Sequence, residues 1–457
     1  MQRVLIANRG EIACRVIRAC RALGLQTVAV YSEADANALH VEMADVAVAI
    51  GPPPASQSYL NYERILAAAV EHKADGVHPG YGFLSENTDF ARAAEASGVT
   101  WIGPTPQSIE DMGDKERARD IAKAAGVPVL VGSTRFAPGE LHGLAEAART
   151  VGFPLLVKAT GGGGGIGMRR VDAPDALEAA VTATQQQALK SFGDGTIYLE
   201  RLVARARHVE VQVFGYGDGR AVHLFERECS IQRRFQKIIE ESPAPGLPAE
   251  IPARMAEAAA SLAAHQRYRG PGTVEFIVDA DTLDFYFLEM NTRIQVEHPV
   301  TEMITGWDLV QQQIKLAAGE AEAVPQSEIT RRGAAIECRL YAENPAKNFM
   351  PSPGRLDVFT LPDAMADVRV DTGVRQGDAI TPYYDPMIAK MIVWGSDRQA
   401  ALDKMLVALA ASRIEGVKNN LSFLQAVIRH PEFQAGRIDT GLIDRERAAL
   451  LAAMPGA

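Results

Sequence analysis

The chain has 457 residues, of which 47% are hydrophobic, a size and composition that suit two to four structural units with large cores. A formal net charge of -10 argues against general attraction to nucleic acid or to an anionic membrane surface. The apolar runs are too short to span a bilayer, and the first residues show no signal-peptide pattern. The four cysteines show no paired metal spacing, so we expect a cytoplasmic protein with reduced thiols.

The N-terminal part of the chain alternates between short apolar strands and amphipathic helices. Strands are predicted at residues 4–7 and 27–31, and Ile12, Val16, Cys20 and Leu23 mark one face of the helix between them. Strands joined through a helix are parallel and have a right-handed crossover. We therefore predict a Rossmann-like α/β unit over residues 1–113.

The rest of the chain is predicted to form two further units, at residues 114–330 and 331–445, and a frayed tail at residues 446–457. In the middle unit, alternating polarity and tight turns predict antiparallel strands at residues 208–214, 222–226, 273–278 and 285–290. In the last unit we predict strands at residues 334–341 and 388–394 and helices at residues 398–411 and 421–428.

Five consecutive glycines at residues 161–165 follow a predicted strand that carries Lys158. Consecutive glycines let backbone N–H groups approach phosphate oxygens, and Lys158 is placed to neutralise one phosphate. No Gly-Lys-Ser/Thr follows, so the run is not a Walker A motif. The alternative is a flexible linker, which the preceding strand disfavours.

The stretch from residue 287 to residue 298 is the most informative part of the chain. Read as one extended strand, it places five polar side chains on one face and apolar side chains on the other. The polar face comprises Glu289, Asn291, Arg293, Gln295 and Glu297. Burying this face without a ligand costs a few kcal/mol for each group. Carboxylates, an amide and a guanidinium at regular spacing suit a metal ion and an oxyanion together.

Glu275 lies one predicted hairpin away from Glu289. Directly opposed residues on paired strands have Cβ atoms about 5 Å apart, and two carboxylates at that separation repel each other unless a cation lies between them. Mg²⁺ prefers one or two carboxylates together with phosphate oxygens. The pair therefore predicts a nucleotide-metal clamp, with edge salt bridges as the alternative.

Other charged residues have weaker patterns. Glu200 ends a strand where the chain bridges two units, a natural place for adenine, although spacing alone favours an exposed carboxylate. Residues 226–237 are dense in cations and amides, with a solvated loop as the alternative. Glu337 and Arg339 share one face of a strand, where a guanidinium can stabilise an anion or an enolate. Taken alone, that strand favours an exposed ion pair.

Several motifs occur in one order along the chain. They are residues 7–13 (ANRGEIA), 78–87 (HPGYGFLSEN), 112–115 (MGDK), the glycine run, and 289–299 (EMNTRIQVEHP). In this order they closely resemble the biotin carboxylase component of biotin-dependent, acyl-CoA-type carboxylases, which belong to the ATP-grasp superfamily. The resemblance covers about residues 2–445. It implies an ATP-grasp domain with a mobile glycine-rich lid at about residues 131–203, followed by a C-terminal α+β biotin carboxylase domain.

The resemblance also implies a role for each matching residue. The implied nucleotide contacts are Lys115, Lys158, Gly163, Gly164, Gly165, Glu200, Val203, His208 and Gln232. The implied metal ligands are Glu275, Glu289 and Asn291, and the implied bicarbonate pocket is Lys237, Arg293, Gln295 and the backbone of Val296. Glu297 is implied as the base that deprotonates bicarbonate, Arg339 as the group that stabilises the biotin enolate, and Tyr81 as a second biotin contact.

The implied activity is carboxylation of biotin by bicarbonate, with MgATP as the energy source and Mn²⁺ as an alternative ion. The chain lacks the Met-Lys-Met motif of a biotinylated carrier and a carboxyltransferase region. We therefore expect biotin to arrive on a separate carrier protein, expect a carboxyltransferase partner, and expect a homodimer.

Three residues depart from the common family pattern: Phe235 replaces a histidine, Ile166 an arginine, and Arg201 a lysine. They bear on nucleotide affinity and subfamily rather than on the reaction class. Two alternatives remain open from the sequence. One is another ATP-grasp ligase, and the other is a catalytically silent ATP-binding subunit.

Overall fold

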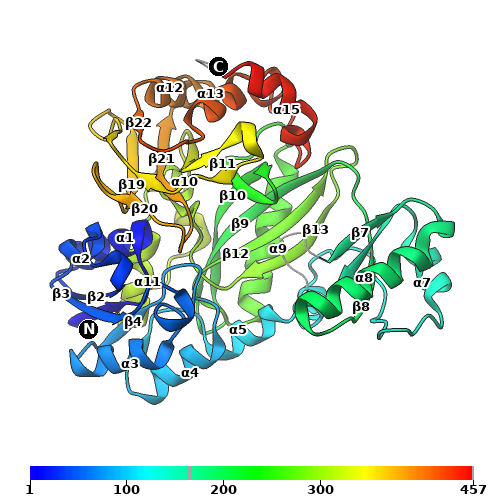
Figure 1. Cartoon of the computed structure of the whole chain (residues 1–457). Coiled ribbons are helices and arrows are strands. Elements are labelled where there is room, and N and C mark those ends of the chain that lie inside the picture. The colour runs from blue at the N-terminus through cyan, green and yellow to red at the C-terminus, as the bar shows by residue number, and fades with distance from the viewer. Residues whose placement is uncertain (162–166, 455–457) are drawn as a thin grey trace.

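The computed structural model describes residues 1–161 and 167–454, which form a large antiparallel sheet with smaller units around it (Figure 1). The N-terminal unit, drawn in blue, lies at one side of this sheet. A unit containing α7 (Leu144–Val151), α8 (Leu177–Phe192), β7 (Met168–Val171) and β8 (Ile197–Arg201) projects from the opposite side, and the C-terminal helices lie above the sheet. The predicted fold class, α/β followed by α+β, is confirmed.

The N-terminal unit contains a five-stranded parallel sheet in the order β3-β2-β1-β4-β5, as predicted. Successive residues of β1 enter two different cores, since Leu5 packs with Phe90 of α4 whereas Ile6 packs with Val16 of α1. Burial on both faces explains why these strands are continuously apolar. The strands are β1 (Arg3–Ile6), β2 (Gln26–Ser32), β3 (Val46–Gly51), β4 (Gly76–His78) and β5 (Thr100–Trp101). The helices are α1 (Gly10–Ala22), α2 (Leu39–Met43), α3 (Tyr62–Glu71), α4 (Thr88–Ala96) and α5 (Pro106–Gly113).

The projecting unit has its own small core. Its antiparallel sheet has the order β7-β6-β8, and Leu155, Val157 and Leu199 pack against Val181. The strands are β6 (Leu155–Ala159), β7 (Met168–Val171) and β8 (Ile197–Arg201), and the helices are α7 (Leu144–Val151) and α8 (Leu177–Phe192). This is the segment for which the sequence predicts a lid. Gly163, Gly164, Gly165 and Ile166 lie outside the described residues.

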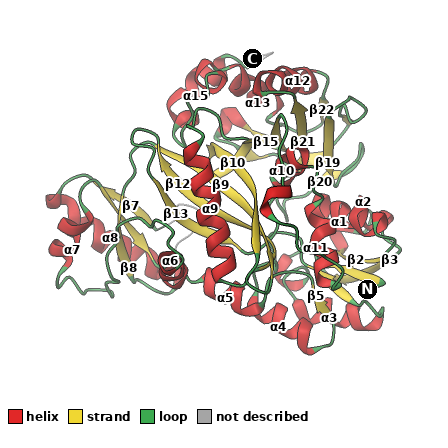
Figure 2. Ribbon diagram, turned by 180° about the vertical axis from the view of Figure 1, so that it is seen from behind, coloured by secondary structure: helices red, strands yellow, loops and turns green. Residues whose placement is uncertain are grey.

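The large sheet has eight antiparallel strands in the order β13-β12-β9-β10-β11-β14-β21-β19. Strand β9 (Ala206–Tyr216) packs its alternate residues Val209, Val211 and Val213 against α9 (Glu250–His265), which Figure 2 shows lying across this face. The residues between them face the opposite side, so the pleat separates an apolar face from a polar one. The strands are β9 (Ala206–Tyr216), β10 (Ala221–Arg233), β11 (Gln236–Ser242), β12 (Arg269–Asp279), β13 (Phe285–Asn291), β14 (Ala334–Tyr341), β19 (Val368–Thr372) and β21 (Met387–Gly395).

The large sheet crosses the boundary predicted at residues 330 and 331, because β11 pairs with β14. The remaining helices are α6 (Lys115–Ala124), α9 (Glu250–His265), α10 (His298–Thr305), α11 (Leu309–Ala317), α12 (Arg398–Ala410), α13 (Leu421–Arg429), α14 (Pro431–Gln434) and α15 (Leu442–Ala452). Short strand pairs complete the C-terminal part: β15 (Glu343–Asn344) with β16 (Met350–Pro351), β17 (Gly354–Arg355) with β20 (Ala379–Ile380), and β18 (Val358–Thr360) with β22 (Arg413–Glu415).

The prediction of a frayed tail from residue 446 is wrong for its first part. Helix α15 continues to Ala452, and Leu450 is buried in the core formed by β14, β21 and α13. Apolar packing of this last turn outweighs the tendency of a chain end to fray. Within the described ranges, no helix combines the length and the apolar character needed to cross a membrane.

Candidate active site

A cavity of about 900 Å³ lies where the N-terminal unit, the polar face of the large sheet and the C-terminal strands meet. It brings together most of the residues that the sequence singles out. They are Tyr81, His208, Gln232, Lys237, Glu275, Glu289, Asn291, Arg293, Gln295, Val296, Glu297 and Arg339. Phe235 also lines this cavity, and its side chain is exposed.

The stretch from residue 287 to residue 298 is not one extended strand. Strand β13 ends at Asn291, and residues 292–297 turn before α10 begins at His298. Pro299 stands in the first turn of α10, where its missing N–H and fixed φ favour a helix start. The imidazole Nδ1 of His298 lies 2.7 Å from the backbone oxygen of Gln295 and closes the turn. The five polar side chains still line one cavity, because the turn keeps them on the cavity side.

Lys237, the second residue of β11, holds three carboxylates at once. Its Nζ donates to Glu210 at 2.6 Å, to Glu297 at 2.8 Å and to Glu275 at 2.9 Å. Burial alone would lower the pKa of Lys237, but these carboxylates outweigh it and raise the pKa well above its ordinary value. Lys237 is therefore a permanent cation at the centre of the cavity.

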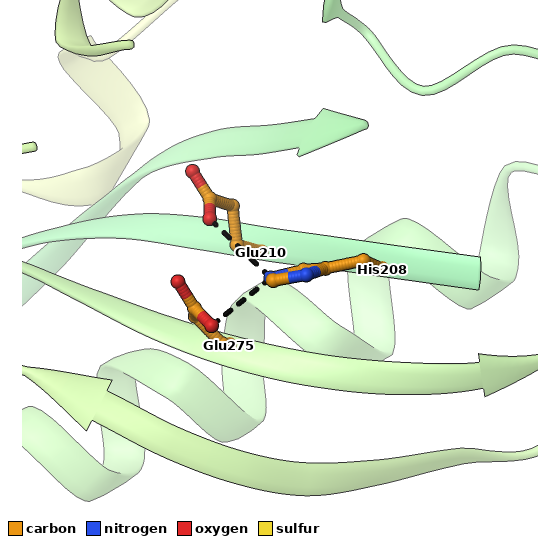
Figure 3. Close-up of side chains that lie close together, drawn as sticks. All are labelled: His208, Glu210 and Glu275. Carbon is orange, nitrogen blue, oxygen red and sulfur yellow. Dashed lines mark ion pairs between the residues drawn. The ribbon is translucent and has the colours of Figure 1, made fainter. Parts of the chain in front are cut away.

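His208 adds to this cluster from β9. Figure 3 shows its imidazole facing Glu210, on the same strand, and Glu275, on the adjacent strand. Its Nε2 lies 3.0 Å from Glu275 and 3.7 Å from Glu210, while its Nδ1 lies 2.9 Å from the Gln232 amide. Burial lowers the pKa of His208, but Glu275 and Glu210 together outweigh burial and the net shift is upward.

The predicted pairing of Glu275 with Glu289 is confirmed, since the two residues are direct partners on β12 and β13. Burial and the neighbouring Glu275 together raise the pKa of Glu289, as expected for two crowded carboxyl groups. Asn291 accepts a hydrogen bond from Arg293 at 2.9 Å, and its buried Nδ2 has no hydrogen-bond partner in the part of the chain that the structure describes. These hard oxygen donors fit Mg²⁺ better than a softer ion.

A second set of possible ligands, His208, Glu210 and Glu275, has atoms within 4.8 Å of one another. Lys237 already donates to two of its members, so this set has less need of a metal cation than the Glu275–Glu289 pair. We therefore prefer the predicted set of metal ligands, whose role remains a prediction.

Glu297 lies between Lys237 and Arg339, and its second oxygen accepts from Arg339 at 3.1 Å. Burial raises the pKa of Glu297, but Lys237, Arg339 and Arg227 outweigh burial and lower it below its ordinary value. Glu297 is therefore ionised, as a proton acceptor must be.

Arg339 also contacts Glu240 on β11, which lies directly opposite Glu337 on β14. All three residues are buried, so the alternative of an exposed ion pair at Glu337 and Arg339 is wrong. Burial raises the pKa of Glu240 to about 7 and raises the pKa of Glu337 well above its ordinary value. The carboxyl oxygens of Glu337 have no hydrogen-bond partner among the described residues.

The predicted nucleotide contacts do not all lie in this cavity. A second cavity of about 800 Å³, between α6 and the projecting unit, is lined by Lys115, Gly161 and Tyr198. Lys158 and Glu200 form an ion pair at 2.7 Å and line neither cavity, and Val203 is buried. Burial lowers the pKa of Lys115, and Glu289 opposes this shift, so Lys115 is electrostatically coupled to the predicted metal site.

The sequence patterns assign no individual role to several residues of the site. Glu210 and Arg227 are fully buried and joined by an ion pair of 2.6 Å, and Glu86 of the N-terminal unit holds the Arg293 guanidinium at 2.9 Å. The alternating polarity of residues 208–212 was a usable indication for Glu210, because His208 and Gln212 share its face. The contact between Glu86 and Arg293 joins distant parts of the chain and has no local pattern.

An antiparallel sheet with paired carboxylates, a cation-lined pocket and a small three-stranded unit beside it is the architecture of an ATP-grasp protein. Family models match three consecutive parts of the chain. They are "Biotin carboxylase, N-terminal domain" at residues 1–109, "Carbamoyl-phosphate synthase L chain, ATP binding domain" at residues 114–323, and "Biotin carboxylase C-terminal domain" at residues 337–445. The chain belongs to the biotin carboxylase family, which confirms the resemblance seen in the sequence.

Individual relatives agree with this assignment. Biotin carboxylase 1 of Bacillus subtilis is 48% identical over 447 residues, which are 97% of this chain and 98% of that protein. The mitochondrial methylcrotonoyl-CoA carboxylase subunit alpha of Mus musculus is 50% identical over 456 residues, which are 98% of this chain. The chain spans only 62% of the length of that mouse protein.

Solved structures are also similar. The biotin carboxylase domain dimer of Hydrogenobacter thermophilus 2-oxoglutarate carboxylase, in complex with MgADP, ADP and bicarbonate, has a TM-score of 0.92 and 44% identity, with 98% of each chain covered. The biotin carboxylase from Campylobacter jejuni, in a complex described as β,γ-ATP, has a TM-score of 0.92 and 43% identity, with 97% of this chain and 98% of that chain covered.

Proposed function

We propose that this protein carboxylates biotin with bicarbonate and ATP, releasing ADP and phosphate. The observation that carries the proposal is one cavity that holds the Glu275–Glu289 pair beside the cluster of Lys237, Glu297 and Arg339. Such a cavity can bind a metal-nucleotide and an anion side by side, as transfer of the γ-phosphoryl group to bicarbonate requires.

The charges around Glu297 explain how a carboxylate with a lowered pKa can act as a base. Bicarbonate entering beside Lys237 and Arg293 competes with Glu297 for Lys237. A weaker hold on Glu297 raises its affinity for a proton, so substrate binding itself activates the base. Glu297 then takes the bicarbonate proton, and the resulting oxygen nucleophile attacks the γ-phosphorus as ADP leaves.

The carboxyphosphate formed in this way breaks into CO₂ and phosphate, and the phosphate removes the proton from biotin N1′. Arg339 stabilises the negative charge that develops on the ureido oxygen, and N1′ attacks CO₂ to form the new C–N bond. Glu275, Glu289 and Asn291 would hold Mg²⁺, which when bound offsets the charge of the triphosphate. Exclusion of water protects carboxyphosphate from hydrolysis, which is the role we assign to the predicted lid.

We further propose the setting of this reaction. Biotin arrives on a carrier protein, a carboxyltransferase partner uses the carboxybiotin, and the protein is a cytoplasmic homodimer. The relatives support the partners and the dimer, since one is a subunit of an acyl-CoA carboxylase and a similar domain is described as a dimer. The four cysteines are free and buried, as expected in a reducing compartment.

The proposal is tested by measuring ADP release that depends on bicarbonate, with and without free biotin. We expect the rate to rise when biotin is added. A folded, ATP-binding sample whose rate does not respond to biotin would contradict the proposal. In that case, a rise with ammonia or an amino acid instead would identify another ATP-grasp ligase, and no turnover at all would indicate a silent ATP-binding subunit.

Separate variants test the biotin step. Arg339→Ser should impair carboxylation of biotin by about two to three orders of magnitude, because it removes a donor to developing charge. Bicarbonate-dependent ATP hydrolysis without biotin should fall much less. Equal losses in both assays would remove Arg339 from the enolate role.

A further inference from the structure

Lys390 is a fully buried cation that takes no part in the proposed reaction steps. It lies in β21 among apolar residues, and its side chain has no exposed surface. Taking an ammonium group out of water carries a large cost unless several acceptors surround it. Lys390 therefore requires an explanation in the contacts that it makes.

Its Nζ joins three parts of the molecule. It donates to the backbone oxygen of Val296 at 2.8 Å, pairs with Glu11 of α1 at 3.0 Å, and lies 3.8 Å from Asp371 of β19. One ammonium group thus links the turn at residues 292–297, the N-terminal unit and the C-terminal strands. Glu11 in turn accepts a hydrogen bond from the hydroxyl of Tyr81, so the contact continues to the predicted biotin-binding residue.

The contact with Val296 acts directly on the proposed base. The carbonyl of Val296 and the N–H of Glu297 belong to one planar peptide unit, so holding the carbonyl orients the backbone from which the Glu297 side chain extends. Lys390 is also the direct partner of Arg339 in the pairing of β14 with β21, which places both side chains on one face of the sheet.

We propose that Lys390 is a positioning residue that holds Glu297 through the Val296 peptide and Tyr81 through Glu11. This inference rests on the proposed function. It explains why one side chain contacts both the loop that carries the base and the unit that carries a biotin contact. Lys390 itself touches neither the reacting atoms nor biotin.

The test compares Lys390→Met with wild-type protein in two assays. Lys390→Met keeps the length of the side chain and removes its charge and hydrogen bonds. We expect kcat for bicarbonate-dependent ATP cleavage to fall at least tenfold, KM for biotin to rise several-fold, and KM for ATP to change less than twofold. Loss of a residue with only a structural role would not change kcat and the KM for biotin while leaving the KM for ATP nearly unchanged.

Two controls separate positioning from stability. Met405 is buried in the same C-terminal core and lines neither cavity. Met405→Ala therefore lowers stability, as Lys390→Met is expected to do, without changing the site. The double variant Lys390→Met with Glu11→Gln removes the uncompensated Glu11 charge, so it keeps the test usable if Lys390→Met alone does not fold. We expect the double variant to recover stability but not kcat.

Unchanged kcat and KM for biotin in a folded Lys390→Met protein would overturn the inference. A loss of activity no larger than that of a Met405→Ala protein with matched unfolding free energy would also overturn it. Failure of the proposed function is distinguishable, because wild-type protein itself would then show no response to biotin.

Discussion

At the scale of single residues, the site depends on charges that are held close together out of water. Glu297 touches two cations, Lys237 and Arg339, and each of these cations touches at least one further carboxylate. Removing one member leaves a buried partner uncompensated, so truncation has larger effects here than at surface ion pairs. Glu297→Gln and Glu337→Gln keep the shape of the side chain and remove only its ability to ionise.

Glu297→Gln should lower biotin-dependent turnover by about 10²- to 10⁴-fold, because an amide cannot accept the bicarbonate proton. Binding of ATP and the fold should survive, as judged by nucleotide titration and by circular dichroism. Glu241→Gln is a matched control, since Glu241 is buried, pairs with Arg398 at 2.6 Å and lines neither cavity. Turnover near the wild-type rate in Glu297→Gln would remove Glu297 from the role of base.

Glu337→Gln should change how stability depends on pH. The raised pKa of Glu337, which burial causes, means that the folded state holds its proton more tightly than the unfolded state. Its contribution to the free energy of unfolding is therefore present below about pH 4.5 and declines by up to about 1.4 kcal/mol per pH unit above it.

The variant lacks this decline, so its stability relative to wild type should improve as the pH rises from 5 to 7. Urea unfolding at three pH values measures the difference. If the free energies of unfolding of the two proteins change in parallel with pH, Glu337 does not hold a proton in the folded state.

At the scale of secondary structure, the turn between β10 and β11 is unusual. Arg234 and Phe235 have φ values of 50° and 64°, in the left-handed region that tight hairpins favour but that non-glycine residues seldom adopt. Arg233 clamps the turn on one side through its ion pair with Glu343. Such strain, of order 1 kcal/mol or more for each residue, often marks functional positions, and Phe235 lines the site cavity.

Phe235→Gly should therefore raise the free energy of unfolding by about 1 kcal/mol, because glycine adopts this conformation without a Cβ penalty and little apolar burial is lost. Urea denaturation measures the gain. Lys73→Gly is a control, since Lys73 has a φ of 52° and lines neither cavity. If the Phe235 side chain contacts a substrate, Phe235→Gly should also raise the KM for that substrate, whereas Lys73→Gly should not. A loss of stability in Phe235→Gly would show that the side chain packs more than its exposure indicates.

At the scale of the whole molecule, three units meet at one buried carboxylate. Glu302 of α10 contacts Arg15 of α1 at 2.9 Å and Arg369 of β19 at 2.6 Å. The cavity is lined by residues of the same three parts of the chain, so any loosening of their contacts changes its shape. Ion pairs at this junction therefore bear on both stability and activity.

Glu302→Gln should lower the free energy of unfolding by about 3 kcal/mol, because the buried guanidinium of Arg15 and the partly buried guanidinium of Arg369 each lose a partner charge. Chemical denaturation measures the loss. The exposed pair of Arg413 with Glu415 provides a comparison, and Glu415→Gln should change stability by less than about 0.5 kcal/mol. Equal small effects at both positions would show that the junction is held by apolar packing instead.

The sequence alone determined the parallel N-terminal sheet, the antiparallel pairing of Glu275 with Glu289, and the family. The first two depend on patterns that local geometry enforces, namely continuous apolar strands separated by helices and period-two alternation. The family rests on the resemblance of motifs in a set order. The extent of β13 and of α15 was misjudged, because a helix start at Pro299 and the burial of Leu450 override strand alternation and end fraying.

Only the tertiary structure decided that Lys237 joins three carboxylates, that Arg293 is held by Glu86, and that Lys390 reaches Val296 and Glu11. These contacts join residues far apart in the chain, where no spacing rule applies. They form because a charge buried by one part of the chain must find its partner on whichever other part packs against it.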